Sequence, residues 1–244
     1  MTRGKLIVVE GMDGGGKTTQ ANLIEIWCNT VIPDQPVVRL KEPGSSFDGA
    51  FRSMLFEQEY SKDLNQVTAG LLFFLDHYNT ALAAEEAVAA GKTVLCDRWC
   101  YSQYAYDSVK HSSNVDSLAL YRKYEEIQIK PDLVLLFETD PETATARLQA
   151  RTDKKVQQSD KQWGDREDLN RAMILEYREL LEKYHPTRSQ QRRHAAMAGK
   201  PAPQFDLTPP NPVKWALIVQ GPHIEAADVF ERMVEPRLVE LFYE

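Results

Sequence analysis

The feature that most constrains the fold is a glycine-rich turn between an apolar segment and a helix near the amino terminus. Residues 5–10 form a short apolar run, KLIVVE, and residues 11–18 read GMDGGGKT, which fits the pattern G-x-x-x-x-G-K-[ST]. Glycines let backbone N–H groups curl around phosphate oxygens, and the following helix adds the positive end of its dipole. The pattern predicts a P-loop that binds the phosphates of a nucleoside triphosphate.

Each polar residue of this loop has an expected task. Lys17 is placed to reach the β- and γ-phosphates, and the hydroxyl of Thr18 is placed to ligate Mg²⁺. We therefore expect ATP and Mg²⁺ as cofactors. A glycine-rich turn with a surface lysine is the competing interpretation, but the strand before the loop and the helix after it disfavour that. The predicted ATP-binding residues of the loop are Gly11, Gly14, Gly15, Gly16, Lys17, Thr18 and Thr19.

Further apolar runs predict the rest of the sheet. They occupy residues 37–40, 93–97, 133–137 and 215–219, and stretches of helical character separate most of them. Nearly continuous apolar strands of this kind are typical of parallel sheets that are buried on both faces. We expect an α/β fold with a five-stranded parallel sheet and helices on both faces. The chain 1–244 is expected to form one domain, with a lid at about 151–166 and an extra surface loop at about 185–212.

Composition excludes several other classes of protein. The net charge of −7 and the pI of about 5.4 argue against a dedicated nucleic-acid-binding protein. No stretch approaches the roughly 18 apolar residues of a membrane span, and the amino terminus lacks a signal-peptide core. We expect a soluble, cytoplasmic protein whose partners are small nucleotides, with no nucleic acid and no membrane.

A second polar motif follows the predicted strand 93–97. Asp97 and Arg98 stand at its carboxyl end, where ligands bind in open parallel sheets. Asp97 suits a water-mediated contact to Mg²⁺, and Arg98 suits a second phosphate group. An N-K-x-D motif and an L-S-G-G-Q motif are both absent from the sequence, which disfavours a GTPase switch and a transport ATPase.

Five collinear motifs carry a family resemblance. They read EGMDGGGKTTQ, KEPG, LLFF, DRWCYSQYAY and KPDLVLLF, in this order from about residue 5. Together they resemble the thymidylate kinase family, and the likeness extends to about residue 184 and resumes over 214–243. The resemblance implies a P-loop nucleoside monophosphate kinase fold with a lid. It also implies phosphoryl transfer from ATP to a deoxynucleoside 5′-monophosphate, with dTMP as the default acceptor, usually by a homodimer.

The resemblance also assigns roles to acceptor-site residues. Asp13 would meet the sugar 3′-hydroxyl and the acceptor-phosphate region, Phe73 would stack on the base, and Tyr106 would select deoxyribose. The acceptor phosphate would be held by Lys41, Arg52 and Arg98, and the pocket would be completed by Pro43, His77, Ser102, Gln103 and Asp107. The expected catalytic set is Asp13, Lys17, Asp97, Arg98 and Arg151.

Positive charge for the transferring phosphoryl group is expected from the lid. One style of the family carries an arginine inside the P-loop, but here Gly14 and Gly15 stand at those positions. The other style supplies basic residues from the lid, where Arg151 is our first candidate and Arg166 our second. An arginine supplied in this way is worth about 10³–10⁵ in rate. Most of the other lid charges are expected to be solvated.

Two departures from the family pattern fall on residues that would read the base edge. His77 stands where an arginine is typical, and Asp107 stands where a glutamine is typical. An ionised Asp only accepts hydrogen bonds, whereas Gln both donates and accepts. The acceptor is therefore either dTMP or another pyrimidine deoxynucleotide, such as dCMP, 5-methyl-dCMP or 5-hydroxymethyl-dUMP. A P-loop ATPase or nucleotide-binding regulator is the alternative from another class.

Overall fold

The computed structural model describes residues 3–44, 50–56, 66–110, 128–150, 167–184, 214–221 and 224–243. Within these ranges the chain forms the predicted five-stranded parallel sheet, in the order β2-β3-β1-β4-β5. Its strands are β1 (Leu6–Glu10), β2 (Val37–Lys41), β3 (Thr93–Asp97), β4 (Leu133–Thr139) and β5 (Lys214–Gln220). Each of them covers the apolar run that predicted it, except that β1 begins one residue later, at Leu6.

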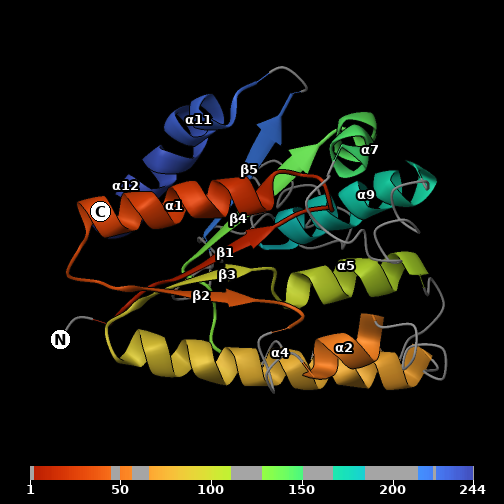
Figure 1. The fold of residues 1–244 in the computed structure, drawn as a ribbon, viewed down its shortest axis with the longest axis horizontal. Coiled ribbons are helices and arrows are strands. Elements are labelled where there is room, and N and C mark those ends of the chain that lie inside the picture. Colours follow the sequence, from red (N-terminus) through yellow and green to blue (C-terminus); the bar gives the residue numbers. More distant parts are fainter. Residues whose placement is uncertain are drawn as a thin grey trace, which may run out of the picture.

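Helices cover both faces of the sheet, as the sequence predicts (Figure 1). One face packs against α1 (Lys17–Val31) and the carboxyl-terminal helices α11 (Ala226–Val229), η2 (Phe230–Val234) and α12 (Glu235–Tyr243). The other face packs against α4 (Gln66–Ala89), α5 (Cys100–Lys110) and α9 (Glu167–Tyr184). The short helix α2 (Ala50–Phe56) lies beside α4, and α7 (Pro141–Gln149) follows β4 (Figure 1).

The central strand β1 is covered on both faces, and this explains why its sequence is apolar without alternation. Leu6 and Val8 pack into the core on the α4–α5–α9 face, while Ile7 and Val9 pack into the core on the α1 face. All four side chains are fully buried. Because successive side chains of a strand point to opposite faces, a strand that is covered on both sides favours apolar residues at successive positions, and in β1 only the last residue, Glu10, is polar.

The strand order brings the functional motifs together. β1 pairs with β3 on one side and with β4 on the other, so the carboxyl ends of three central strands lie next to one another. The P-loop leaves β1 at this edge, and the Asp97–Arg98 motif leaves β3 beside it. Such an edge is the ligand-binding position of open α/β sheets. Among the described helices, none has the length and hydropathy needed to cross a bilayer.

Candidate active site

The P-loop connects β1 to α1 in a conformation that only glycine adopts easily. Gly11 has a φ of 132° and Gly14 a φ of 78°, and both values lie in the left-handed region. Space is equally restrictive. A Cβ on Gly11 would lie 2.2 Å from the carbonyl oxygen of Phe137, and one on Gly14 would lie 2.4 Å from that of Ala144. The glycines therefore let the loop run against β4 and α7.

Lys17 begins α1 and lies across the loop that precedes it. Its Nζ atom donates hydrogen bonds to the carbonyl oxygens of Gly11 (2.9 Å) and Met12 (2.8 Å). Burial and the nearby guanidinium of Arg98 together lower the pKa of Lys17 to about 8, although the carboxylates of Asp13 and Asp97 oppose the shift. The side chain is thus a cation held beside the loop, in the place predicted for a phosphate contact.

Arg98 joins the acceptor-site motifs to the P-loop. Its guanidinium donates to Asp13 Oδ1 (2.7 Å), to the carbonyl oxygen of Gly11 (3.1 Å) and to Ser102 Oγ (2.8 Å). Tyr106 closes this set, because its hydroxyl donates to Asp13 Oδ2 (3.0 Å) and lies 3.3 Å from the guanidinium. The Arg98 and Lys17 cations hold the pKa of Asp13 well below its usual range, despite burial. Four predicted site residues, from two motifs far apart in the sequence, are therefore in one network.

Glu10 and Tyr177 belong to the same network, although sequence reasoning missed both. The carboxylate of Glu10 accepts hydrogen bonds from the Ser102 hydroxyl (2.6 Å), the Tyr177 hydroxyl (3.2 Å) and the Trp99 amide (2.8 Å). Burial raises the pKa of Glu10 to about 7, and the positive charge of Arg98 opposes that shift. An acidic residue at the end of the apolar run 5–10 was a signal for Glu10, but nothing in the sequence linked it to Tyr177.

Asp97 offers an atom that suits a metal ion or its water shell. The residue is only 6% exposed, and its Oδ1 atom has no hydrogen-bond partner among the described residues. Its Oδ2 atom lies 3.8 Å from Nζ of Lys41. Thr18 and Thr19 stand in the first turn of α1 with exposed side chains. Oxygen donors of this type suit Mg²⁺. No group of three or more His, Cys, Asp or Glu side chains arranged for direct metal binding occurs in the described ranges.

The segment after β2 places the other predicted phosphate ligands. Glu42 and Pro43 are joined by a cis peptide bond, and the carbonyl oxygen of Pro43 accepts a hydrogen bond from Arg52 (2.9 Å). The Gly44 amide donates to Asp76 Oδ2 (3.0 Å), which ties this turn to α4. Lys41 directly precedes this turn and Arg52 is hydrogen-bonded to it. The Glu42 amide donates to the Asp97 carbonyl oxygen (2.9 Å).

His77 is buried in a set of protein partners. Its Nδ1 atom forms a short hydrogen bond with the carboxylate of Glu42, and its Nε2 atom lies 2.9 Å from Oε1 of Gln128. The ring packs edge-on against Trp99, with 4.8 Å between ring centroids. Burial raises the pKa of Glu42, whereas the neighbouring His77 lowers it. Glu42 and Gln128 are further residues of this region that sequence reasoning missed.

The other residues predicted around the base lie on α4 and α5. Phe73 is half-buried on α4, one helical turn before His77. On α5, the side-chain amide of Gln103 donates to Asp107 Oδ2 (2.8 Å), one turn further along. The i, i+4 spacing of each pair predicts a shared helix face, and for Gln103 and Asp107 the structure confirms it with a direct contact.

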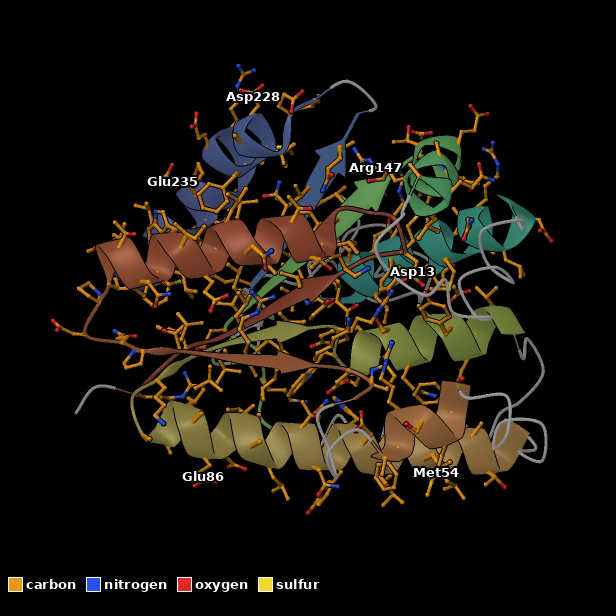
Figure 2. All side chains as sticks on the ribbon, viewed as in Figure 1. Asp13, Met54, Glu86, Arg147, Asp228 and Glu235 are labelled. Atoms are coloured by element: carbon orange, nitrogen blue, oxygen red, sulfur yellow. The ribbon has the colours of Figure 1, made fainter. Side chains whose placement is uncertain are left out.

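A basic side chain beside the P-loop comes from α7. Arg147 lies 3.5 Å from the carbonyl oxygen of Gly14 and 3.3 Å from Oε1 of Gln220 at the end of β5. Gln220 in turn donates to the carbonyl oxygen of Gly15 (3.1 Å). Figure 2 shows Arg147 and Asp13 at the same end of the molecule. The predicted lid residues Arg151 and Arg166 lie outside the described residues, as do the predicted lid and the 185–212 loop. Sequence reasoning selected Arg151 and missed Arg147, four residues earlier.

The sheet topology, the P-loop and the linked arginine define a nucleoside monophosphate kinase of the P-loop class. The family model named Thymidylate kinase matches residues 9–187. A thymidylate kinase from Paraburkholderia xenovorans (strain LB400) is 33% identical over 156 residues, which are 63% of this chain and 74% of that protein. A thymidylate kinase from Caldicellulosiruptor saccharolyticus is 30% identical over 186 residues, or 75% of this chain and 85% of that protein.

A solved structure agrees with these sequence comparisons. The crystal structure of thymidylate kinase from Ehrlichia chaffeensis is similar in fold, with a TM-score of 0.63. It is 17% identical in sequence, and the alignment covers 98% of this chain and 99% of that one. The chain therefore belongs to the thymidylate kinase family. The predicted family and fold are both confirmed.

Proposed function

We propose that this protein transfers the γ-phosphoryl group of ATP to dTMP and forms the diphosphate. The observation that carries the proposal is the direct link between Arg98, Asp13 and the P-loop carbonyl of Gly11. This link sets an acceptor-site cation beside the loop that takes the donor phosphates. Family membership supports dTMP as the acceptor and ATP as the donor.

The residues at this edge of the sheet divide the work. The P-loop amides and Lys17 hold the β- and γ-phosphates of ATP, and Arg98, Arg52 and Lys41 hold the phosphate of the acceptor. Thr18 and Asp97 are the residues that would hold Mg²⁺, which neutralises the charge on the β- and γ-oxygens when bound. Positioning two reactants in line removes most of the entropic barrier to their reaction, so little other chemistry is required of the protein.

The sugar of the acceptor is positioned by Asp13 and Tyr106. Their side chains are hydrogen-bonded to each other, and Tyr106 also lies against the guanidinium of Arg98, with 5.4 Å from the guanidinium carbon to the ring centroid. A phenol fixed in this way leaves little room for an added 2′-hydroxyl group. We therefore expect deoxyribose to be preferred over ribose.

A second candidate acceptor is a pyrimidine deoxynucleotide with a changed base edge. It is supported by the bonding of His77 and Asp107, which pair with Glu42 and Gln103. A histidine ring whose Nδ1 atom is paired with the carboxyl group of Glu42 differs from an arginine fork that extends to the base. The candidate acceptors whose base edge differs from that of dTMP are dCMP, 5-methyl-dCMP and 5-hydroxymethyl-dUMP.

The test is ADP production from Mg-ATP with a panel of monophosphates. The panel contains dTMP, dUMP, dCMP, 5-methyl-dCMP, 5-hydroxymethyl-dUMP, dGMP, dAMP and ribo-TMP. We expect the highest kcat/KM with dTMP, and a lower value with ribo-TMP because of Tyr106. A preference for a cytosine or a modified base would replace dTMP by the second candidate. ATP hydrolysis that no monophosphate affects would instead identify a P-loop ATPase or regulator.

We further propose that two copies of the chain associate through α4. Leu71, Leu75, Tyr78 and Leu82 recur at spacings of four, three and four residues, and their exposed fractions lie between 41% and 48%. Such a spacing places the four side chains along one face of the helix, and a self-complementary face suits a twofold dimer. Sedimentation should give a dimer for the wild type and a monomer for Leu75→Glu. Ile26→Glu, at an exposed apolar residue on α1, is the matched control.

A further inference from the structure

We propose that Glu10 is a positioning residue, which holds the Arg98 guanidinium in place for the phosphate of the acceptor monophosphate. Glu10 lies at the end of β1, just before the P-loop, and no role in phosphate binding falls to it directly. The inference rests on the proposed function, because it concerns the residue assigned to the acceptor phosphate. It adds a residue that makes acceptor binding depend on a buried carboxylate behind the site.

The first support is the way Glu10 holds the backbone of Arg98. Arg98 has a φ of 76°, a left-handed conformation that a non-glycine residue keeps only when its surroundings hold it there. The next amide along the chain, that of Trp99, donates to Glu10 Oε1 (2.8 Å). The Ser102 amide donates to the same atom (3.2 Å). Glu10 thus accepts from two N–H groups at the start of α5, where a helix leaves donors short of partners, and the Ser102 amide is shared with the Trp99 carbonyl oxygen (2.9 Å).

The second support is the way Glu10 holds the side chain of Arg98. Its Oε2 atom accepts a hydrogen bond from Ser102 Oγ (2.6 Å), and Ser102 Oγ accepts one from the Arg98 guanidinium (2.8 Å). The Tyr177 hydroxyl donates to the same Oε2 atom (3.2 Å) and lies 2.9 Å from Ser102 Oγ. A single carboxylate therefore fixes both the backbone and the guanidinium of Arg98.

The third support is burial. Glu10 has no exposed surface, and Arg98 is 9% exposed. A buried carboxylate is costly unless donors surround it, and here three residues supply four of them. The donors come from the β3–α5 connection, α5 and α9, so the cluster ties three parts of the chain to β1. Packing alone would be satisfied by an apolar residue at this position, whereas Glu10 satisfies the donors around Arg98.

The experiment measures the binding of dTMP and of ATP separately, by calorimetry, on the full chain. Glu10→Gln keeps the shape but removes the charge, and its amide nitrogen cannot accept a hydrogen bond from Ser102 or Tyr177. We expect the Kd for dTMP to rise about tenfold or more, because charge-assisted hydrogen bonds to the Arg98 cluster are lost. The Kd for ATP should change by about twofold or less, because Glu10 acts on the P-loop indirectly, through the hydrogen bond from Arg98 to the Gly11 carbonyl oxygen.

Two further variants keep the test decisive. Tyr177→Phe leaves Glu10 in place but removes one of its donors and a 3.4 Å contact to the Arg98 guanidinium, and it should raise the Kd for dTMP about threefold. If Glu10→Gln fails to fold, as judged by circular dichroism, the Tyr177→Phe result decides. The matched control is Glu235→Gln, whose carboxylate accepts a hydrogen bond from Trp27 (3.0 Å) on the α1 face, away from Asp13 (Figure 2). It should leave both affinities unchanged.

The possible results separate this inference from the proposed function. Wild-type affinity for dTMP in both Glu10→Gln and Tyr177→Phe would overturn the inference and leave the proposed function intact. An equal loss of dTMP and ATP binding would also overturn it, because the role of Glu10 would then be general stability. A wild-type protein that binds ATP but none of the monophosphates would overturn the proposed function, and the inference with it.

Discussion

The candidate site has a phosphate end, which is the P-loop with Lys17, and a base end, which surrounds His77 and Asp107. The two ends are built by different means. At the phosphate end, backbone groups do most of the work: the glycines of the P-loop turn against β4 and α7, and Lys17 spans the loop. At the base end, side chains pair with side chains from other elements, as His77 does with Glu42 and Gln128. The phosphate end is thus a local product of one short segment, whereas the base end is assembled from several.

This difference separates phosphate binding, which is the same for every nucleotide, from base recognition, which differs between nucleotides. A phosphate presents the same oxygens whatever base it carries, so a loop of amides and one lysine serves every nucleoside triphosphate. A base is recognised by the pattern of donors and acceptors on its edge, and a single replaced side chain alters that pattern. We therefore expect changes at the phosphate end to reduce the rate, and changes at the base end to alter acceptor preference.

The largest effect is expected from Lys17→Met. The variant keeps an unbranched side chain but removes the cation beside the P-loop, so kcat should fall by about 10²–10³-fold. The free energy of unfolding should fall by no more than about 1–3 kcal/mol, because the carbonyl oxygens of Gly11 and Met12 lose a donor. Steady-state kinetics and urea unfolding would check both statements. Lys92→Met, at an exposed lysine just before β3, is the control and should keep wild-type rates. A Lys17→Met enzyme with full kcat would contradict the role of the loop.

The double variant His77→Arg with Asp107→Gln is expected to have a smaller effect. It should change the preference between acceptor nucleotides and not the rate of phosphoryl transfer. An arginine can still pair with the buried carboxylate of Glu42, and a glutamine can both donate and accept. The ratio of kcat/KM for dTMP to that for dCMP should rise about tenfold or more. The measurement is competition between the two acceptors at equal concentration.

The control for this double variant is Glu86→Gln, an exposed residue near the far end of the same helix (Figure 2). An unchanged ratio in the double variant would show that these two residues do not read the base edge. The pairing with Glu42 and Gln103 would then be structural.

The same difference between the two ends explains what the sequence could predict. The five strands, the P-loop and the Asp97–Arg98 motif each appear in one continuous stretch, so their place and order follow from apolar patterning and one short motif. Glu10, Tyr177, Glu42 and Gln128 meet their partners only through the folded sheet and helices. Contacts over such separations leave no spacing rule in a single sequence. The exception is an i, i+4 pair such as Gln103 and Asp107, which one helix brings together.

Gly14→Ala tests how strictly the phosphate end depends on its backbone. The new Cβ would have to occupy a left-handed conformation and would lie 2.4 Å from the Ala144 carbonyl oxygen. We expect a loss of at least about 1–2 kcal/mol in the free energy of unfolding. Gly70→Ala is the matched control, since it lies within α4 with nothing within 4 Å of the added Cβ. It should be neutral or stabilise by about 0.5–1 kcal/mol. Equal effects of the two changes in urea unfolding would remove the argument for a constrained loop.

The smallest effect is expected at the start of α7, the helix that packs against the P-loop. Asp140 caps α7, the helix that carries Ala144 and Arg147, and its side chain accepts a hydrogen bond from the Thr143 amide (2.9 Å). Asp140→Ala should lower the free energy of unfolding by about 1 kcal/mol and leave acceptor preference unchanged. The hydrogen bonds from Thr143 lower the pKa of Asp140 below its ordinary 3.8, so the cap contributes fully above that value and is lost as pH falls through the lowered pKa. Urea unfolding of wild type and variant should therefore differ at pH 7 and converge in acid. A difference that persists at low pH would mean that packing, and not the carboxylate, holds the start of α7.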